Sequence, residues 1–272
     1  MATKVVFDSN TWRKVASPSK FRKDADAPLY QRIHDACASA KISGLLSETT
    51  FTLEQIKREE RLDWIKSGSQ IAVTETTGMP GVIGIRIVLS PSTSVTPANV
   101  GMVKDHLNDA LTIGFKILRS KRIAGPRSPI LTDSMFVAYE SDQEFHEFNN
   151  RSGEVSRDIE QLGVGIANIK GYGNSLTSDT VGIHWTDGIA SLAGSKEERS
   201  KVAEMVAEWA DVDALSTAIA HGAEFFCTND VATGSTNKGV RSIMLPNNVA
   251  AVTGKYGIKI VTPQELASSL SL

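Results

Sequence analysis

Carboxylate side chains stand at four points of this sequence that an open parallel sheet would bring together: Asp8, Glu54, Asp213 and Asp230. Asp8 follows the apolar run 4–7, and Asp230 follows the aromatic-rich run 224–229. In an open α/β sheet, residues placed after the strands meet beyond the carboxyl ends of those strands, although they are distant in sequence. Clustered carboxylates repel one another unless a cation holds them together. The acids therefore predict a divalent metal site.

The oxygen donors of this set indicate Mg²⁺, with Mn²⁺ as a substitute, because carboxylates are hard ligands. No cluster of histidine or cysteine suggests zinc. Mg²⁺ beside a phosphodiester supplies positive charge at the nonbridging oxygens and lowers the pKa of a bound water, and a second ion can stabilise the leaving oxygen. We expect Asp8 and Asp230 to coordinate an ion directly. Asp213 is the third expected ligand, and with Glu54 it would bind a second ion or orient the attacking water.

Two glutamates, Glu48 and Glu54, are candidates for the second acid of the set. Ser47 suits the N-cap of a helix over residues 47–66, so that Glu48 falls in its first turn and Glu54 nearly two turns further. At 100° per residue the two side chains leave such a helix in well-separated directions. Only one of them is therefore expected to reach the site.

The elements that must position these residues alternate between strand and helix. Residues 4–7, 41–46, 224–227 and 258–261 read as strands, whereas 28–37, 47–66, 195–221 and the segment from Pro263 read as helices. This alternation predicts a mainly parallel central sheet covered by helices, a three-layer α/β/α fold. Asp211 and Asp213 also suit the start of a helix, where the helix dipole favours carboxylates.

The central part of the chain is harder to assign. Residues 81–89 alternate and are β-branched, and with the loop 90–97 they indicate an insertion with its own hairpin. A helix is expected over 99–116 and a strand over 117–123. Residues 142–193 are polar and glycine-rich, with helical signal only at 154–162. We therefore divide the chain into a core, 1–66 and 195–272, and an insertion, 67–194, of which 99–123 continues the core and the rest is partly irregular.

The two ends of the chain resemble the PIN domain family of nucleases. Asp8-Ser9-Asn10 after the first strand, and the path from Asp213 through a helix and a strand to Thr228-Asn229-Asp230, resemble that family's acidic motifs. The resemblance covers 4–65 and 200–265, and the long stretch between Glu54 and Asp213 departs from it. It implies a metal-dependent ribonuclease in which Asn10 and Thr228 support the acids. It also favours Glu54 over Glu48, because family members carry the glutamate about six residues beyond such a serine.

Composition sets limits on this interpretation. A net charge of −2 over 272 residues gives no overall attraction to nucleic acid, so RNA binding requires a local basic surface. Two basic groups can contact a phosphate backbone, namely Lys116, Arg119, Lys121, Arg122 and Arg127, and Arg13, Lys14, Lys20, Arg22 and Lys23. Single-stranded RNA is the expected substrate. Trp12 and Trp64 are available for stacking on a base, although burial is the expectation for both.

The sequence also indicates a cellular compartment and leaves two alternative functions to consider. Two cysteines, no signal-like start and no membrane-length apolar run predict a cytoplasmic protein. A homo-oligomer is left open. An aspartyl-phosphate phosphohydrolase would need a second Asp at position 10, where Asn stands. The non-enzymatic alternative is an inactive PIN-like domain that binds RNA or protein.

Overall fold

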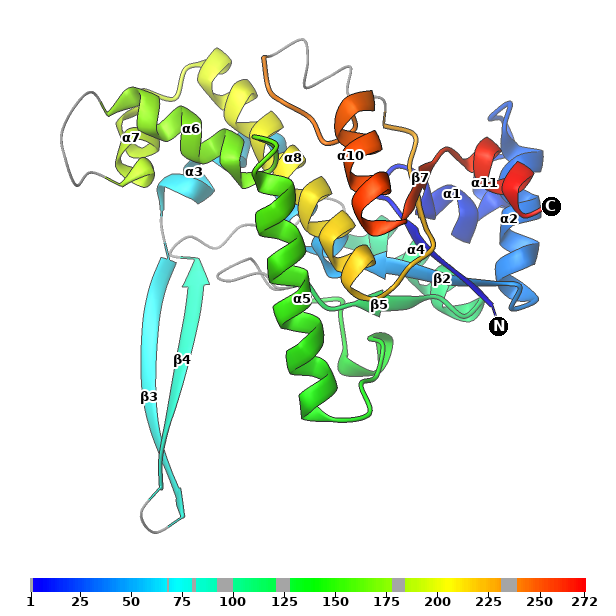
Figure 1. Cartoon of the computed structure of the whole chain (residues 1–272), viewed down its shortest axis with the longest axis horizontal. Coiled ribbons are helices and arrows are strands. Elements are labelled where there is room, and N and C mark those ends of the chain that lie inside the picture. Colours follow the sequence, from blue (N-terminus) through cyan, green and yellow to red (C-terminus); the bar gives the residue numbers. More distant parts are fainter. Residues whose placement is uncertain are drawn as a thin grey trace.

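A five-stranded parallel sheet forms the centre of the computed structural model (Figure 1). The residues that the structure describes are 2–67, 69–79, 82–91, 100–120, 128–177, 184–230 and 239–272, with backbone alone for the second and third ranges. The strands, in the order in which they lie side by side, are β5 (Lys116–Leu118), β2 (Ile42–Ser47), β1 (Thr3–Phe7), β6 (Phe225–Cys227) and β7 (Lys259–Val261). The predicted α/β class with a mainly parallel sheet is confirmed.

β1 occupies the middle of this sheet because its apolar residues are buried on both faces, as is usual in parallel sheets. Val5 pairs with Gly44 of β2 on one side and with Phe225 of β6 on the other. Phe7 is the last residue of the strand and pairs with Cys227. Asp8 and Thr228 therefore leave two neighbouring strands at the same carboxyl-terminal edge.

Helices cover both faces of the sheet, and the alternation along β1 shows how. Val5 and Phe7 pack on one side, whereas Val6 packs on the other. The first layer contains α1 (Trp12–Ala16), α2 (Ala27–Ala38), α4 (Val100–Thr112) and α11 (Pro263–Ser269). The second layer contains α5 (Asp142–Glu160), α8 (Lys196–Ala220) and α10 (Pro246–Tyr256). The result is a three-layer α/β/α arrangement (Figure 1).

The amino-terminal half of α8 extends past the sheet and packs in a third apolar cluster. This cluster contains residues of α3 (Arg61–Lys66), α6 (Ile166–Leu176) and α7 (Trp185–Ser191). The prediction that 142–193 would be helical only at 154–162 was wrong, because α5, α6 and α7 occupy most of it. Its glycines partly explain the error: a Cβ on Gly173 or Gly188 would clash with the backbone of the partner helix, so both glycines allow α6 and α7 to touch.

The segment before α3 also differs from its prediction. In place of one helix over 47–66, three short 3₁₀ turns precede α3: Glu48–Phe51, Leu53–Gln55 and Arg58–Glu60. Ser47 does cap the first turn, because its hydroxyl accepts the Thr49 backbone N–H. The Thr52 hydroxyl donates to the carbonyl of Glu48, an interaction that competes with regular helix formation. The side-chain directions inferred from a continuous helix therefore do not apply here.

The predicted hairpin in the central segment is confirmed. β3 (Ser69–Met79) and β4 (Val82–Pro91) pair antiparallel and extend away from the sheet (Figure 1). The helix expected over 99–116 is α4, and the strand expected over 117–123 is the shorter β5. Among the described residues, no helix has the length and apolar character needed to span a membrane.

Candidate metal centre

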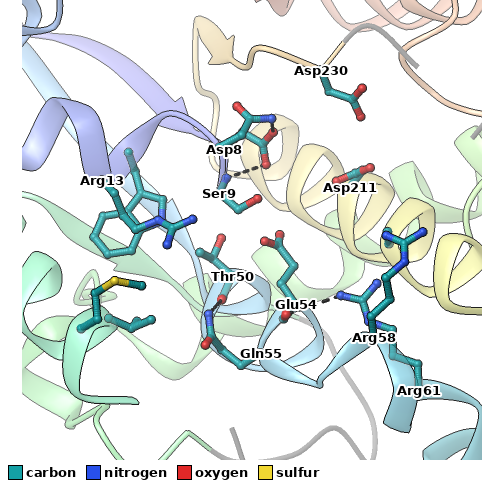
Figure 2. Close-up of a pocket in the computed structure, with 15 residues that line it drawn as sticks. Asp8, Ser9, Arg13, Thr50, Glu54, Gln55, Arg58, Arg61, Asp211 and Asp230 are labelled. Atoms are coloured by element: carbon teal, nitrogen blue, oxygen red, sulfur yellow. Dashed lines mark hydrogen bonds between the residues drawn. The ribbon is translucent and has the colours of Figure 1, made fainter. Parts of the chain in front are cut away.

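A polar cleft of about 400 Å³ lies at the carboxyl-terminal edge of the sheet (Figure 2). The turn after β1 contributes Asp8, the second 3₁₀ turn contributes Glu54, α8 contributes Asp211, and the turn after β6 contributes Asp230. Arg13, Arg58 and Arg61 also line it. The cleft therefore combines carboxylates from four separate parts of the chain with three arginine side chains.

Asp8 is the most enclosed of these acids, with only 5% of its surface exposed. Its Oδ1 accepts the Ser9 backbone N–H at 2.7 Å, and its Oδ2 accepts the Thr228 hydroxyl at 2.6 Å and the Asn10 amide at 2.7 Å. Burial raises the pKa of Asp8 and nearby Asp230 raises it further, whereas these hydrogen bonds lower it. The hydrogen bonds thus hold the carboxylate in one orientation. Its charged form is nevertheless disfavoured when no cation is nearby.

Asn10 and Thr228 join the two turns that hold the acids. Asn10 Oδ1 accepts the backbone N–H of Asn229 at 2.9 Å, and Thr228 Oγ1 accepts the backbone N–H of Asp230 at the same distance. The Asn10 amide also donates to Thr228 Oγ1 at 3.2 Å. The contact between these two residues and the acidic turns agrees with the supporting position expected for them.

Replacing Thr228 with Val is expected to lower metal affinity and any metal-dependent activity roughly 10- to 100-fold, the usual effect of removing a hydrogen bond to a metal ligand. The change keeps the shape of the side chain but removes a donor to Asp8. Isothermal titration with Mn²⁺ measures it. Thr217→Val is the matched control, because the Thr217 hydroxyl is buried without a hydrogen-bond partner among the described residues. Equal Mn²⁺ affinities of the two variants would contradict this role of Thr228.

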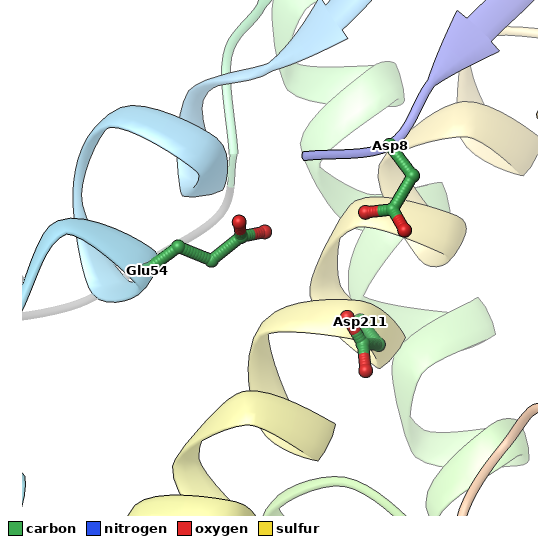
Figure 3. A group of neighbouring side chains, drawn as sticks. All are labelled: Asp8, Glu54 and Asp211. Atoms are coloured by element: carbon green, nitrogen blue, oxygen red, sulfur yellow. The ribbon is translucent and has the colours of Figure 1, made fainter. Parts of the chain in front are cut away.

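Two overlapping groups of carboxylates lie in or beside the cleft. Ligand oxygens of Asp8, Glu54 and Asp211 lie within 4.8 Å of one another (Figure 3). Those of Glu208, Asp211 and Asp230 also lie within 4.8 Å of one another. Glu208 Oε2 additionally accepts the backbone N–H of Ile243 at 3.2 Å. Asp211 belongs to both groups and is therefore the central acid of the site.

The negative charges around Asp211 affect its pKa. Burial raises the pKa of Asp211 well above the usual Asp value, and the negative charges of Asp8, Glu208, Glu54 and Asp230 raise it further. A divalent cation between these oxygens would remove the repulsion that raises this pKa. The donors are carboxylate oxygens throughout, so the group fits a hard cation such as Mg²⁺ or Mn²⁺.

The structure brings together three of the acids expected from sequence and replaces the fourth. Asp8, Glu54 and Asp230 line the cleft, but Asp213 does not, and Asp211 stands in its place. The reason is helical geometry, because two residues along α8 turn a side chain by about 200°. The Asp213 carboxylate instead accepts the Thr49 hydroxyl.

Glu48, the competitor of Glu54, also lies outside the cleft lining, and its carboxylate accepts the Ser120 backbone N–H at 3.0 Å.

The spacing of acidic residues along α8 could have identified Asp211 from the sequence, but the sequence analysis missed it. Glu204, Glu208 and Asp211 recur at four and three residues, which places them on one helix face. Because α8 begins at Lys196 rather than near residue 211, the capping interpretation of Asp211 was wrong.

Some of the basic side chains that were expected to contact RNA form ion pairs within the protein instead. Lys14 pairs with Asp24 and Lys20 with Asp109, both at 2.7 Å. Lys121, Arg122 and Arg127 lie outside the described residues. Trp12 and Trp64 are buried, as expected, and neither offers a face for stacking.

Comparison with known proteins adds no assignment, since no family model, curated protein or solved structure matches the chain.

Proposed function

We propose that the protein is a metal-dependent ribonuclease with a PIN-like core, which hydrolyses RNA phosphodiester bonds at the cleft beyond β1 and β6. The observation that carries this proposal is the convergence of Asp8, Glu54 and Asp211 from three separate segments, with their oxygens within 4.8 Å of one another. Asp230 and Glu208 extend the same group. Mg²⁺ is the proposed physiological ion, and Mn²⁺ is expected to substitute for it.

The chain's own residues have distinct parts in this reaction. When bound, Mg²⁺ supplies positive charge for the phosphodiester oxygens and a water of lowered pKa. Asp8, Asp211 and Glu54 would hold the ion, while Ser9, Asn10 and Thr228 keep the Asp8 carboxylate in one orientation. Asp230 belongs to the second group, with Glu208 and Asp211, and is suited to a second ion or to orienting water. Such positioning of charge is the main contribution of protein groups to phosphate chemistry.

The test is cleavage of single-stranded RNA in the presence of Mg²⁺ or Mn²⁺. Asp8→Asn and Asp230→Asn are each expected to lower the rate by more than about 100-fold, since even residues that only support metal ligands are worth 10- to 100-fold. Glu48→Gln is the control, because Glu48 lies outside the cleft lining and accepts a backbone N–H that a glutamine can still bind. Circular dichroism checks that the variants fold.

Full activity in Asp8→Asn and Asp230→Asn would refute the assignment of the site. RNA binding by the wild-type protein without metal-dependent cleavage would instead favour the inactive binding module.

A further inference from the structure

Three arginines line the acidic cleft, but two of them are held by the protein itself. Arg61 is buried and donates to the backbone carbonyls of Ile56 and Ala203, at 3.2 and 2.7 Å. Arg58 forms an ion pair with Glu204 of α8. These contacts fasten the 3₁₀ turns and α8 to each other. Neither guanidinium is fully available to a ligand.

Arg13 differs from the other two. Among the residues that the structure describes, its side chain makes no ion pair or hydrogen bond. Figure 2 shows it on the opposite side of the cleft from Arg58 and Arg61, with the carboxylates of Asp8 and Glu54 between them. The preceding residue, Trp12, is 1% exposed and packs edge-on against Phe51, which fixes the short helix that carries Arg13. A cation is therefore positioned beside the carboxylate cluster with no partner among the described residues.

The helix that packs against α1, which carries Arg13, brings an exposed apolar side chain to the cleft. Met102 of α4 also lines the cleft and is 47% exposed. Only one other large apolar side chain in the described part of the chain, Leu176, is comparably exposed. A flexible thioether makes favourable contacts with flat aromatic groups. A guanidinium with an apolar surface beside it matches a nucleotide, whose phosphate is anionic and whose base is flat and apolar on its faces.

We propose that this side of the cleft binds single-stranded RNA next to the bond that is cleaved, with Arg13 on the neighbouring phosphate and Met102 against an unstacked base. The location of the cleaved bond rests on the proposed function. A guanidinium suits a phosphate because it can donate two parallel hydrogen bonds to its oxygens. A base within a duplex is stacked on both sides and does not expose its face, so the arrangement selects single strands over duplexes.

Binding is measured separately from cleavage, by fluorescence anisotropy with a short labelled oligoribonucleotide and Ca²⁺ in place of Mg²⁺. The integrity of the RNA is checked on a gel after each titration. Arg13→Gln is expected to raise the Kd about 10-fold and to reduce the slope of log K against log salt by about 0.7, the change for one lost phosphate contact on a single strand. Lys14→Gln removes the same charge from the adjacent residue, whose ammonium pairs with Asp24 outside the cleft lining, and serves as the control.

A second pair of variants tests the proposed contact between Met102 and the base. Met102→Ala is expected to raise the Kd for the single strand about 5-fold without changing the salt slope, whereas Leu176→Ala leaves both unchanged. The wild-type protein is expected to bind a duplex of the same length more weakly than the single strand.

The outcomes separate this inference from the proposed function. Arg13-dependent and Met102-dependent binding of single-stranded RNA in a protein that does not cleave with Mg²⁺ would support the binding site and refute the nuclease. Cleavage with Mg²⁺, but equal affinities of Arg13→Gln and Lys14→Gln, would overturn the inference and leave the nuclease standing. Absence of single-strand binding, equal affinities of Met102→Ala and Leu176→Ala, or tighter binding of the duplex would also overturn it.

Discussion

Asp211→Asn is expected to reduce metal-dependent cleavage by more than about 100-fold, whereas Asp213→Asn is expected to stay within about 3-fold of wild type. The two acids are two residues apart on α8, yet only Asp211 shares ligand distances with Asp8, Glu54, Glu208 and Asp230. Loss of the central acid removes a ligand from both groups at once, and loss of a supporting residue alone already costs 10- to 100-fold. Initial rates of RNA cleavage at saturating Mn²⁺ measure the difference.

This pair of variants tests helix geometry directly. Both substitutions remove one negative charge and keep the size of the side chain, so effects of overall charge cancel. An asparagine at position 213 still accepts a hydrogen bond from the Thr49 hydroxyl. Greater damage from Asp213→Asn than from Asp211→Asn would assign the site to the residue favoured by sequence and contradict the geometry of α8.

The stability of the protein is expected to rise with divalent cations in the wild type and to change little with them after removal of the Asp211 charge. In chelator, Asp211→Asn is expected to unfold at a higher temperature than wild type near neutral pH. The raised pKa values of Asp8 and Asp211 mean that their charged forms are disfavoured in the folded, metal-free protein.

The sign of the pH dependence follows from the same values. Folded-state pKa values above the usual 3.8 mean that the folded chain binds protons more tightly than the unfolded chain. In chelator, the stability of the wild-type protein therefore falls as the pH rises from about 3.8 through the raised values. Asp211→Asn is expected to reduce that fall.

Adding Mn²⁺ is expected to reverse the order of the two proteins. An ion at 100 times its Kd stabilises the folded state by about 2.7 kcal/mol, and Asp211→Asn loses most of this gain. Thermal unfolding with and without Mn²⁺ measures both effects, with Asp213→Asn as the control that keeps the wild-type response. A wild-type melting temperature that does not change with Mn²⁺ would contradict a metal centre in the cleft.

The parts of this structure that sequence predicted correctly are those set by local patterns. The apolar runs at 4–7 and 224–227 became β1 and β6, so the positions of Asp8 and Asp230 followed from the ends of two parallel strands. Gly222 marks the end of α8 with a positive φ of 71°, a conformation that glycine adopts readily. Such features depend on a few neighbouring residues, and sequence contains them fully.

The parts that sequence did not predict depend on contacts between distant segments. Asp211 could be distinguished from Asp213 only by knowing that α8 begins at Lys196 and which of its faces meets β1. Glu54 reaches the cleft from a 3₁₀ turn whose direction is fixed by the packing of Leu53 and Ile56 against α8. Neither direction is encoded in the residues nearby.

The place of β1 between β2 and β6 has a consequence for the order of events during translation. A polypeptide emerging from the ribosome carries Asp8 and β2 early, but β6 and the Thr228 hydroxyl that orients Asp8 are made only after most of the chain. Pairing across such a long separation is slow to form. The carboxylate cluster beyond β1 and β6 is therefore completed only late in synthesis, so a nascent chain carries Asp8 for most of that time without the residues that orient it.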